Sequence, residues 1–247
     1  MSVANLSLVL TKGTNDQWVT IVEGLRQEEI GLQLIKAGFT FQFSDWQKVI
    51  ETQKLEGQLF PDTYLIPVNS SIEKILAIFA KNYQKKVVVG TNNAIINSAK
   101  FSQNDFLILA SLVEREARSD TSRPIVAGII IKRLEAGWPL QVDASVQYAV
   151  ANKKCLLLIT GNQSLTTTCD WWKKDLTQSD LQIKSDYNTY LNRGLPPTPI
   201  CNPSLSAIKA VLNPTKTDYW FYLTGSDNQM HYGRTIEEHN ANIQKYL

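Results

Sequence analysis

Hydrophobic positions change from strand-like to helix-like spacing early in the chain. The segment WVTIVEG, residues 18–24, has the β-branched content of a short strand. Residues 25–38 then place Ile30, Leu34 and Ile35 at helical spacing. The pattern predicts a strand followed by a helix.

A second strand–helix unit is predicted at residues 60–83. FPDTYLIPV is typical of a strand, and Ser70 or Ser71 can cap the helix that follows. The apolar stripe of this helix consists of Ile72, Ile75, Leu76 and Phe79. No linker rich in Gly, Pro or Ser divides the chain, so only the pattern places a domain boundary, near residues 50–60.

The most hydrophobic segment of the chain ends in two glutamates. DFLILASLVEREAR, residues 105–118, predicts a helix that begins with a capping box between Ser102 and Asp105. Glu114 and Glu116 are two positions apart, so a helix directs them to nearly opposite sides. Each glutamate therefore requires its own explanation.

Spacing gives two interpretations of Glu114. The small residues Ala110 and Ser111 lie one turn before it and leave space for a ligand, whereas two bulky residues precede Glu116. The alternative is an ion pair between Glu114 and Arg118 on a solvated face, and spacing alone favours this alternative.

A further helix is predicted at residues 122–137. Ser122 can cap it, and Gly137 follows its last periodic residue. Gln141 and Asp143 then lie in a loop-like context.

Polar and aromatic side chains gather in the turn-rich residues 185–204, which include Tyr187, Asn188, Tyr190 and a Pro-Pro pair. Such a segment forms either a rigid surface loop or the wall of a groove for a sugar polymer. The residue types alone leave both interpretations open.

Composition indicates a globular protein of one or two domains, since 43% of the 247 residues are hydrophobic and 19% are charged. The net charge of +2 includes no basic cluster, which disfavours nucleic acid as a partner. Apolar runs fall short of the roughly 20 residues that span a bilayer. We therefore expect a soluble chain without a targeting segment.

Cysteine and histidine patterns disfavour a metal site. The chain has no C-x-x-C spacing, and His231 and His239 lack an H-E-x-x-H motif, so we expect no metal and no cofactor. Cys155 and Cys169 flank a segment with the β-branched content and Gly-Asn turn of a hairpin-like excursion. In an oxidising compartment we expect these two to form a disulfide, with Cys201 as the free thiol.

Taken in order, five blocks resemble the YceG-like endolytic murein transglycosylases, bacterial enzymes that cut peptidoglycan glycan strands. The resemblance covers almost the whole chain. Its blocks are EGQLFPDTY at 56–64, LASLVEREA at 109–117, RLEAGWPLQVDASVQY at 133–148, YNTYLNRGLPPTPICNP at 187–203 and HYGRTIEEHNANI at 231–243.

The resemblance implies an α+β fold in two parts. A small LysM-like α/β subdomain would occupy residues 1–55, and a mixed α+β YceG-like catalytic domain residues 56–247. Full-length relatives begin with one membrane-spanning helix, which is absent here. The resemblance thus implies the extracytoplasmic face of the bacterial membrane, with peptidoglycan strands and cell-wall synthesis enzymes such as penicillin-binding proteins as partners.

The resemblance also implies site residues. The family's catalytic glutamate falls on Glu114, which would protonate the glycosidic oxygen and then accept a proton from the C6 hydroxyl of MurNAc to leave a 1,6-anhydro end. Desolvation at the end of an apolar helix would raise its pKa. The substrate-contacting positions would be Glu116, Gln141, Asp143, Tyr187, Asn188 and Tyr190.

Two alternatives remain. Asp143 or Glu116 could supply the second carboxylate of a muramidase-type hydrolase, or the chain could be a non-catalytic glycan-binding scaffold. The segment from Cys155 to Trp172 is longer than is usual in the family, and the sequence does not define its path.

Overall fold

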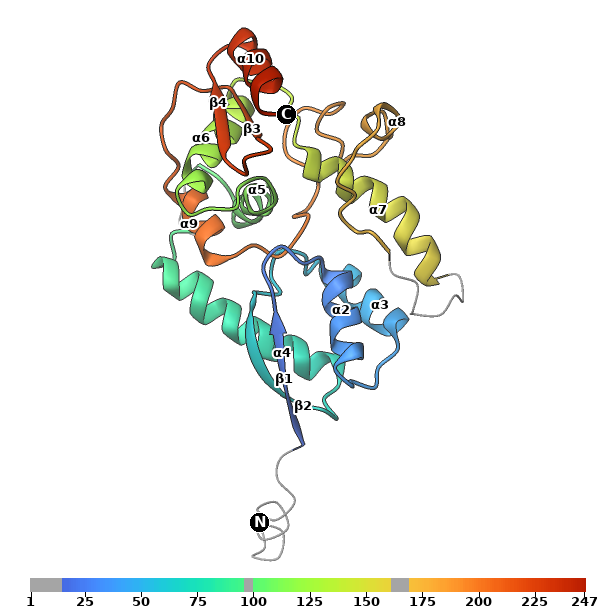
Figure 1. Ribbon diagram of the computed structural model, residues 1–247. Coiled ribbons are helices and arrows are strands. Elements are labelled where there is room, and N and C mark those ends of the chain that lie inside the picture. Colours follow the sequence, from blue (N-terminus) through green and yellow to red (C-terminus); the bar gives the residue numbers. More distant parts are fainter. Residues whose placement is uncertain (1–14, 96–99, 161–168) are drawn as a thin grey trace, which may run out of the picture.

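The computed structural model describes residues 15–95, 100–160 and 169–247 (Figure 1). Its N-terminal part is built on two antiparallel strands, β1 (Asp16–Ile21) and β2 (Asp62–Pro67). Two helices separate them in sequence, α2 (Gln27–Lys36) and α3 (Phe43–Gln53). The predicted strand–helix order is therefore present.

Alternation along the strands decides which side of this sheet is buried. Val19 and Ile21 are buried on β1, whereas Trp18 and Thr20 are exposed. The buried side belongs to a hydrophobic cluster that also contains residues of α2, α3 and α4 (Ile72–Tyr83). The α4 stripe contributes as predicted, through Ile72, Ile75, Leu76 and Phe79.

This cluster runs past residue 55, where we expected the first subdomain to end. Leu59 and the β2 residue Tyr64 belong to it, and so does Phe79 of α4. The strand that completes the N-terminal sheet thus comes from residues that we had assigned to the second domain. A short π-helical turn (Gln84–Val88) and a 3-10 turn (Val89–Thr91) follow α4.

The second hydrophobic cluster surrounds α5 (Gln103–Glu116). Each residue of α5 from Phe106 to Val113 is buried, and the helix packs against α6 (Ser122–Glu135) and α9 (Leu205–Leu212). Figure 1 views α5 nearly end-on, with α6 and α9 beside it. Solvent-facing positions are few, which explains why the sequence shows a solid apolar block rather than a stripe.

The predicted helix starts agree closely with the structure. Ser102 Oγ accepts a hydrogen bond from the Asp105 N–H at 3.2 Å, and the Asp105 carboxylate accepts one from the Ser102 N–H at 3.0 Å. The capping box is therefore confirmed. The cap of α6 is Thr121, one residue before the predicted Ser122.

Helix α7 (Asp143–Thr160) changes two predictions, because it begins at Asp143, which we expected in a loop-like context. It continues through residues 156–160, where we expected a hairpin-like excursion, and residues 161–168 lie outside the described part. Cys155 is bonded to Cys169, with 5.6 Å between their Cα atoms, so the predicted disulfide is confirmed. Cys201 is a buried free thiol.

The remaining elements lie after this segment. A short helix α8 (Gln178–Leu181) is followed by the turn-rich segment and α9, and the chain ends in the hairpin of β3 (Phe221–Thr224) and β4 (Met230–Gly233) with α10 (Ile236–Tyr246). The fold is mixed α+β, as expected. Among the described helices none is long and apolar enough to cross a membrane.

Candidate active site

Helix α5 ends in two glutamates with different surroundings. Glu114 contacts the first residues of α6 and α9, whereas Glu116 contacts the start of α7. Two positions correspond to a turn of about 200° around a helix. The two carboxyl groups occupy separate environments, as their spacing predicts.

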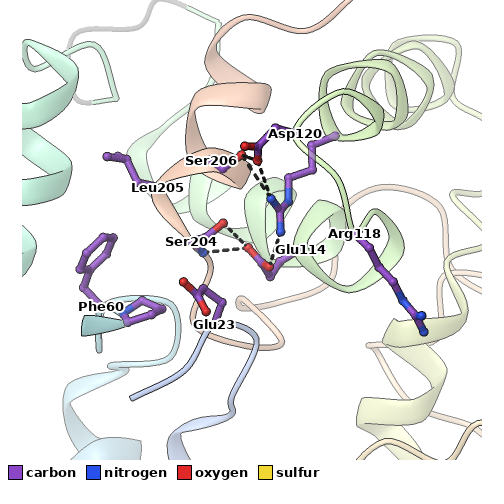
Figure 2. A pocket seen from close by; sticks show the side chains of 10 residues that line it. Glu23, Phe60, Glu114, Arg118, Asp120, Ser204, Leu205 and Ser206 are labelled. Atoms are coloured by element: carbon purple, nitrogen blue, oxygen red, sulfur yellow. Dashed lines mark hydrogen bonds and ion pairs between the residues drawn. The ribbon is translucent and has the colours of Figure 1, made fainter. Parts of the chain in front are cut away.

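Both carboxylate oxygens of Glu114 are engaged by protein groups (Figure 2). Oε1 accepts a hydrogen bond from Arg123 Nη2 at 2.9 Å, and Oε2 accepts from the N–H and Oγ of Ser204 at 2.8 and 2.5 Å. Ser204 also caps α9, because its Oγ accepts from the Ala207 N–H at 3.1 Å. With 6% of its side chain exposed, Glu114 joins α5 to α6 and α9.

An open pocket of about 570 Å³, here called the Glu114 pocket, borders this ion pair. Its wall includes Glu23 and Phe60 from the N-terminal part and Ser206 from α9. Figure 2 shows Arg118 directed away from Glu114. Arg123 pairs with Glu114 instead, so the i, i+4 pair with Arg118 that spacing favours is not formed.

The small residues before Glu114 accommodate the protein's own chain. Ser111 is fully buried, and its Oγ accepts a hydrogen bond from the Ile200 N–H at 3.0 Å while donating to the Ile108 carbonyl at 2.7 Å. Ala110 is equally buried. The space that the sequence suggested for a ligand is therefore occupied by the segment around Ile200.

Glu116 borders a separate cavity of about 770 Å³, here called the Glu116 cleft. Residues from α5, α7, β3 and α10 and from the loops before α7 and α8 meet there. The polar wall of the cleft includes Arg115, Glu116, Arg118, Arg133, Gln141, Asp143, Lys174, Asp175, Tyr190, Tyr222 and His239.

The cleft favours the protonated form of Glu116. Burial, followed by the negative charge of Asp143, raises the pKa of Glu116 to about 7. The partial negative charge at the C-terminal end of α5, where Glu116 is the last residue, acts in the same direction. The Ala144 N–H donates a long hydrogen bond of 3.4 Å to Oε1, and this bond and the nearby Tyr222 hydroxyl lower the pKa by less than burial and Asp143 raise it. At neutral pH such a group is available both as an acid and as a base.

Three predicted substrate-contacting residues share this cleft with Glu116. Tyr190 donates its hydroxyl hydrogen bond to Asp143 Oδ1 at 2.5 Å, and Gln141 adopts a left-handed backbone conformation with φ of 51°. The Gln141 N–H donates to the Thr189 carbonyl at 3.2 Å, which fixes the loop beside the cleft. Gln141, Asp143 and Tyr190 are thus brought together with Glu116.

Asn188 does not reach the cleft. It has no exposed surface, and its Nδ2 donates to the carbonyls of Leu181 and Ile183 at 3.0 and 2.9 Å. Its Oδ1 accepts from the Tyr190 N–H at 3.0 Å. Asn188 therefore holds the loop that carries Tyr190, rather than contacting a sugar as we expected.

Tyr187 also lies away from Glu116. Its hydroxyl is 2.7 Å from Thr198 Oγ1, and its ring packs against Tyr148 with centroids 4.7 Å apart. It borders a different pocket, with Asn192 among its neighbours. The turn-rich segment thus contributes one of its three predicted residues to the Glu116 cleft.

Several cleft residues, Tyr222 among them, were not predicted from the sequence as part of a site, and His239 was considered there only as a metal ligand. Tyr222 has a buried hydroxyl, and burial followed by the charge of Glu116 raises its pKa well above the usual value. His239 stacks on Phe221, and burial lowers its pKa. His239 falls in a block that carries the family resemblance, whereas only the tertiary fold brings Tyr222 to Glu116.

The described residues offer no site for a metal ion. Within residues 15–95, 100–160 and 169–247, no three side chains of His, Cys, Asp or Glu gather closely enough to ligate one.

Three similarities connect this chain to known proteins. It is 36% identical over 196 residues to an endolytic murein transglycosylase of Bacillus subtilis and 31% identical over 199 residues to one of Streptococcus pneumoniae. A crystal structure of a putative yceG-like protein from Listeria monocytogenes matches with a TM-score of 0.74 and 25% identity. That match covers 98% of this chain and 81% of the Listeria chain.

The two sequence matches each cover 78% of this chain but 48% and 32% of the respective relatives, so the chain spans half or less of their length. The model of the YceG-like family matches residues 1–245. By this match over nearly its whole length, the chain belongs to the YceG-like family.

Proposed function

We propose that this chain is an endolytic lytic transglycosylase of peptidoglycan and that Glu116 is its acid and base. The relatives with this name support the reaction class. The observation that carries the choice of residue is the raised pKa of Glu116 in a cleft of about 770 Å³, shared with Gln141, Asp143 and Tyr190.

The reaction needs one carboxyl group. Protonated Glu116 gives its proton to the glycosidic oxygen between MurNAc and GlcNAc as that bond to the anomeric carbon breaks. The C6 hydroxyl of the same MurNAc attacks the anomeric carbon, and ionised Glu116 accepts the hydroxyl proton. The products are a 1,6-anhydro-MurNAc end and a GlcNAc end with a free hydroxyl, and Glu116 is protonated again.

Glu114, to which the resemblance assigned this role, is the alternative acid. Its oxygens accept three hydrogen bonds, one of them from the guanidinium of Arg123. Those contacts suit an ion pair that orders three helices better than they suit a proton donor.

The neighbours of Glu116 have separate roles in this proposal. Burial raises the pKa of Glu116 most and the charge of Asp143 adds to it, while Tyr190 orients Asp143 through the 2.5 Å hydrogen bond. Gln141 lines the same cleft and supplies an amide that can bind sugar hydroxyls.

A muramidase is the second candidate, because Asp143 lies close enough to Glu116 for its charge to act on that group. Asp143 would then activate water or attack the anomeric carbon. Mass spectrometry of products from purified glycan strands separates the cases. Anhydro ends support the transglycosylase, reducing ends support the muramidase, and unchanged strands that bind the protein support a scaffold.

We also propose that the unit from β1 through β2 is the LysM-like subdomain that the resemblance implies, extended beyond residue 55. Its two strands and two helices around one hydrophobic cluster support this assignment. We further propose an extracytoplasmic location, which the proposed substrate supports, and contact with cell-wall synthesis enzymes, which the family resemblance implies. Fractionation of cells expressing the tagged full chain tests the location.

A further inference from the structure

Arg115 lies between the two glutamates in sequence and takes no part in the ion pair of Glu114 with Arg123. It lines the Glu116 cleft, and its charge acts on Glu116. Its guanidinium carbon is 3.7 Å from the centroid of the Trp172 ring. The Arg115 guanidinium also lies close to Gly24, where a Cβ would stand only 3.2 Å from Arg115 Nη1, so the absence of a side chain there leaves room for it. Arg115 is thus held in place by an aromatic ring and a glycine.

No hydrogen bond or ion pair joins Arg115 to another residue in the part of the chain that the structure describes. The carboxylate of Glu29 lies near enough to influence it electrostatically. That carboxylate already accepts hydrogen bonds from Trp172 Nε1 and the Arg26 N–H, both at 3.0 Å. Arg115 therefore retains donors that can serve a ligand.

The disulfide explains how Trp172 is positioned. Cys155 anchors Cys169 to α7, and Trp172 follows three residues later. The neighbouring Trp171 is buried and stacks with the guanidinium of Arg26 at 4.8 Å. Two consecutive tryptophans thus attach this segment to the protein beside Arg115.

Two further cations, Arg118 and Lys174, line the same cleft and form no ion pair with a described residue. Arg133 is also cationic, but it is buried and donates to the carbonyls of Trp220 and Leu140 at 2.8 and 2.6 Å. Three acidic residues line the cleft, Glu116, Asp143 and Asp175. Of these, Asp143 accepts the hydrogen bond from Tyr190. The cleft lining therefore includes three cations, Arg115, Arg118 and Lys174, that pair with no described acidic residue.

We propose that Arg115 is a specificity-determining residue that binds a carboxylate carried on the 3-O-lactyl branch of MurNAc. The inference rests on the proposed function, because sugar hydroxyls and acetamido groups are neutral and this branch carries the anionic groups of a glycan strand. The carboxylate belongs either to the lactyl group itself, in peptide-free strands, or to a peptide attached to it. A planar guanidinium held on an aromatic ring is suited to paired hydrogen bonds with a carboxylate.

Binding to non-reacting protein provides the test. In a Glu116→Gln background, calorimetry measures the affinity of the protein for three tetrasaccharides. The first consists of two GlcNAc–MurNAc units that carry peptides, and the second consists of the same units without peptide. The third is a GlcNAc tetramer, which has no carboxylate. Arg115→Gln should weaken binding of a carboxylate-bearing ligand by roughly 10- to 100-fold and change that of the GlcNAc tetramer by less than about twofold. The ligand that loses affinity identifies the source of the carboxylate.

A matched variant, Arg193→Gln, removes the same charge from an exposed position that lines none of the described pockets. It should leave all three affinities unchanged, and Arg115→Lys should recover part of the loss. Equal weakening of all three ligands, no weakening, or no binding of any ligand would overturn the proposal. Cleavage is not measured in this assay, so failure of the transglycosylase proposal remains distinguishable.

Discussion

Arg123 Nη2 lies 2.9 Å from Glu114 Oε1, and only 13% and 6% of the two side chains are exposed. The pair joins the last turn of α5 to the first turn of α6. Glu116 lies two residues further along α5. Burial raises its pKa most, and the next largest contribution comes from an anion, Asp143, rather than from a cation. Glu114 thus faces a cation and Glu116 an anion. We therefore expect substitution of Glu114 to affect mainly stability and substitution of Glu116 to affect mainly activity.

Glu116→Gln should reduce strand cleavage by about 10²- to 10⁴-fold, because a positioned general acid contributes that much. The amide preserves the shape of the side chain and removes only the transferable proton. Product formation on purified strands measures the effect, and thermal melting monitors folding. Retention of most activity would remove Glu116 from the proposed mechanism.

Glu114→Gln should reduce stability more than chemistry. The variant removes the more buried of the two carboxylates that pair with Arg123 and leaves only the exposed Asp120, which costs up to about 3 kcal/mol of unfolding free energy. Urea denaturation measures this loss, and activity is compared at a temperature where the variant stays folded. If folded Glu114→Gln protein is as inactive as Glu116→Gln protein, Glu114 is the acid, as the sequence resemblance implied.

Activity should fall as the pH rises through about 7, because Glu116 must be protonated to start the reaction. Asp143→Asn removes the charge that raises this pKa, so the falling limb of the pH–rate profile should move to lower pH. Profiles of both proteins test the coupling. Complete inactivity of folded Asp143→Asn at every pH would favour the muramidase instead.

Glu116 should also make stability depend on pH. Its pKa is raised in the folded state above roughly 4.3 in the unfolded chain, so its stabilising contribution is complete below pH 4.3 and is lost as the pH rises through about 7. Glu116→Gln should therefore gain stability relative to the parent protein between these values. Denaturation at pH 4 and pH 8 measures the difference, and an unchanged difference would contradict the raised pKa.

The Cys155–Cys169 bond should contribute about 3 kcal/mol to stability, as is usual for a closed loop of this size. Thiol titration under denaturing conditions should find one reactive thiol, Cys201, in oxidised protein. A Cys155→Ser, Cys169→Ser double variant should melt earlier. Three thiols in oxidised protein would show that the bond does not form in solution.

Local patterns were sufficient to predict much of the fold. The capping box of Ser102 and Asp105, the stripe of α4 and the strand segments of β1 and β2 depend on neighbours in sequence, and all are present. The domain boundary depends on which strand pairs with β1, a long-range contact. Local pattern does not reveal this pairing, so we placed the boundary at residue 55, which lies before β2.

The site was harder to predict because its residues meet only through tertiary packing. Helical spacing correctly separated Glu114 from Glu116, but the sequence did not reveal that the segment around Ile200 fills the space beside Ser111. Nor did it distinguish Asn188, which bonds its own loop, from Tyr190, which bonds Asp143. Polar residues in turns have the same composition in either role.

In the proposed mechanism, turnover depends on interior packing, because Glu116 lies on the last turn of a helix that is buried along most of its length. Leu109 and Leu112 have no exposed surface, so a change in the volume of either side chain shifts helix α5 against its neighbours. A displacement of about 1 Å at a catalytic group can reduce a rate by about 100-fold. Redesign of this interior for heat resistance would therefore also lower the reaction rate. For the same reason, natural variation in rate should be sought among buried leucines that do not contact the substrate.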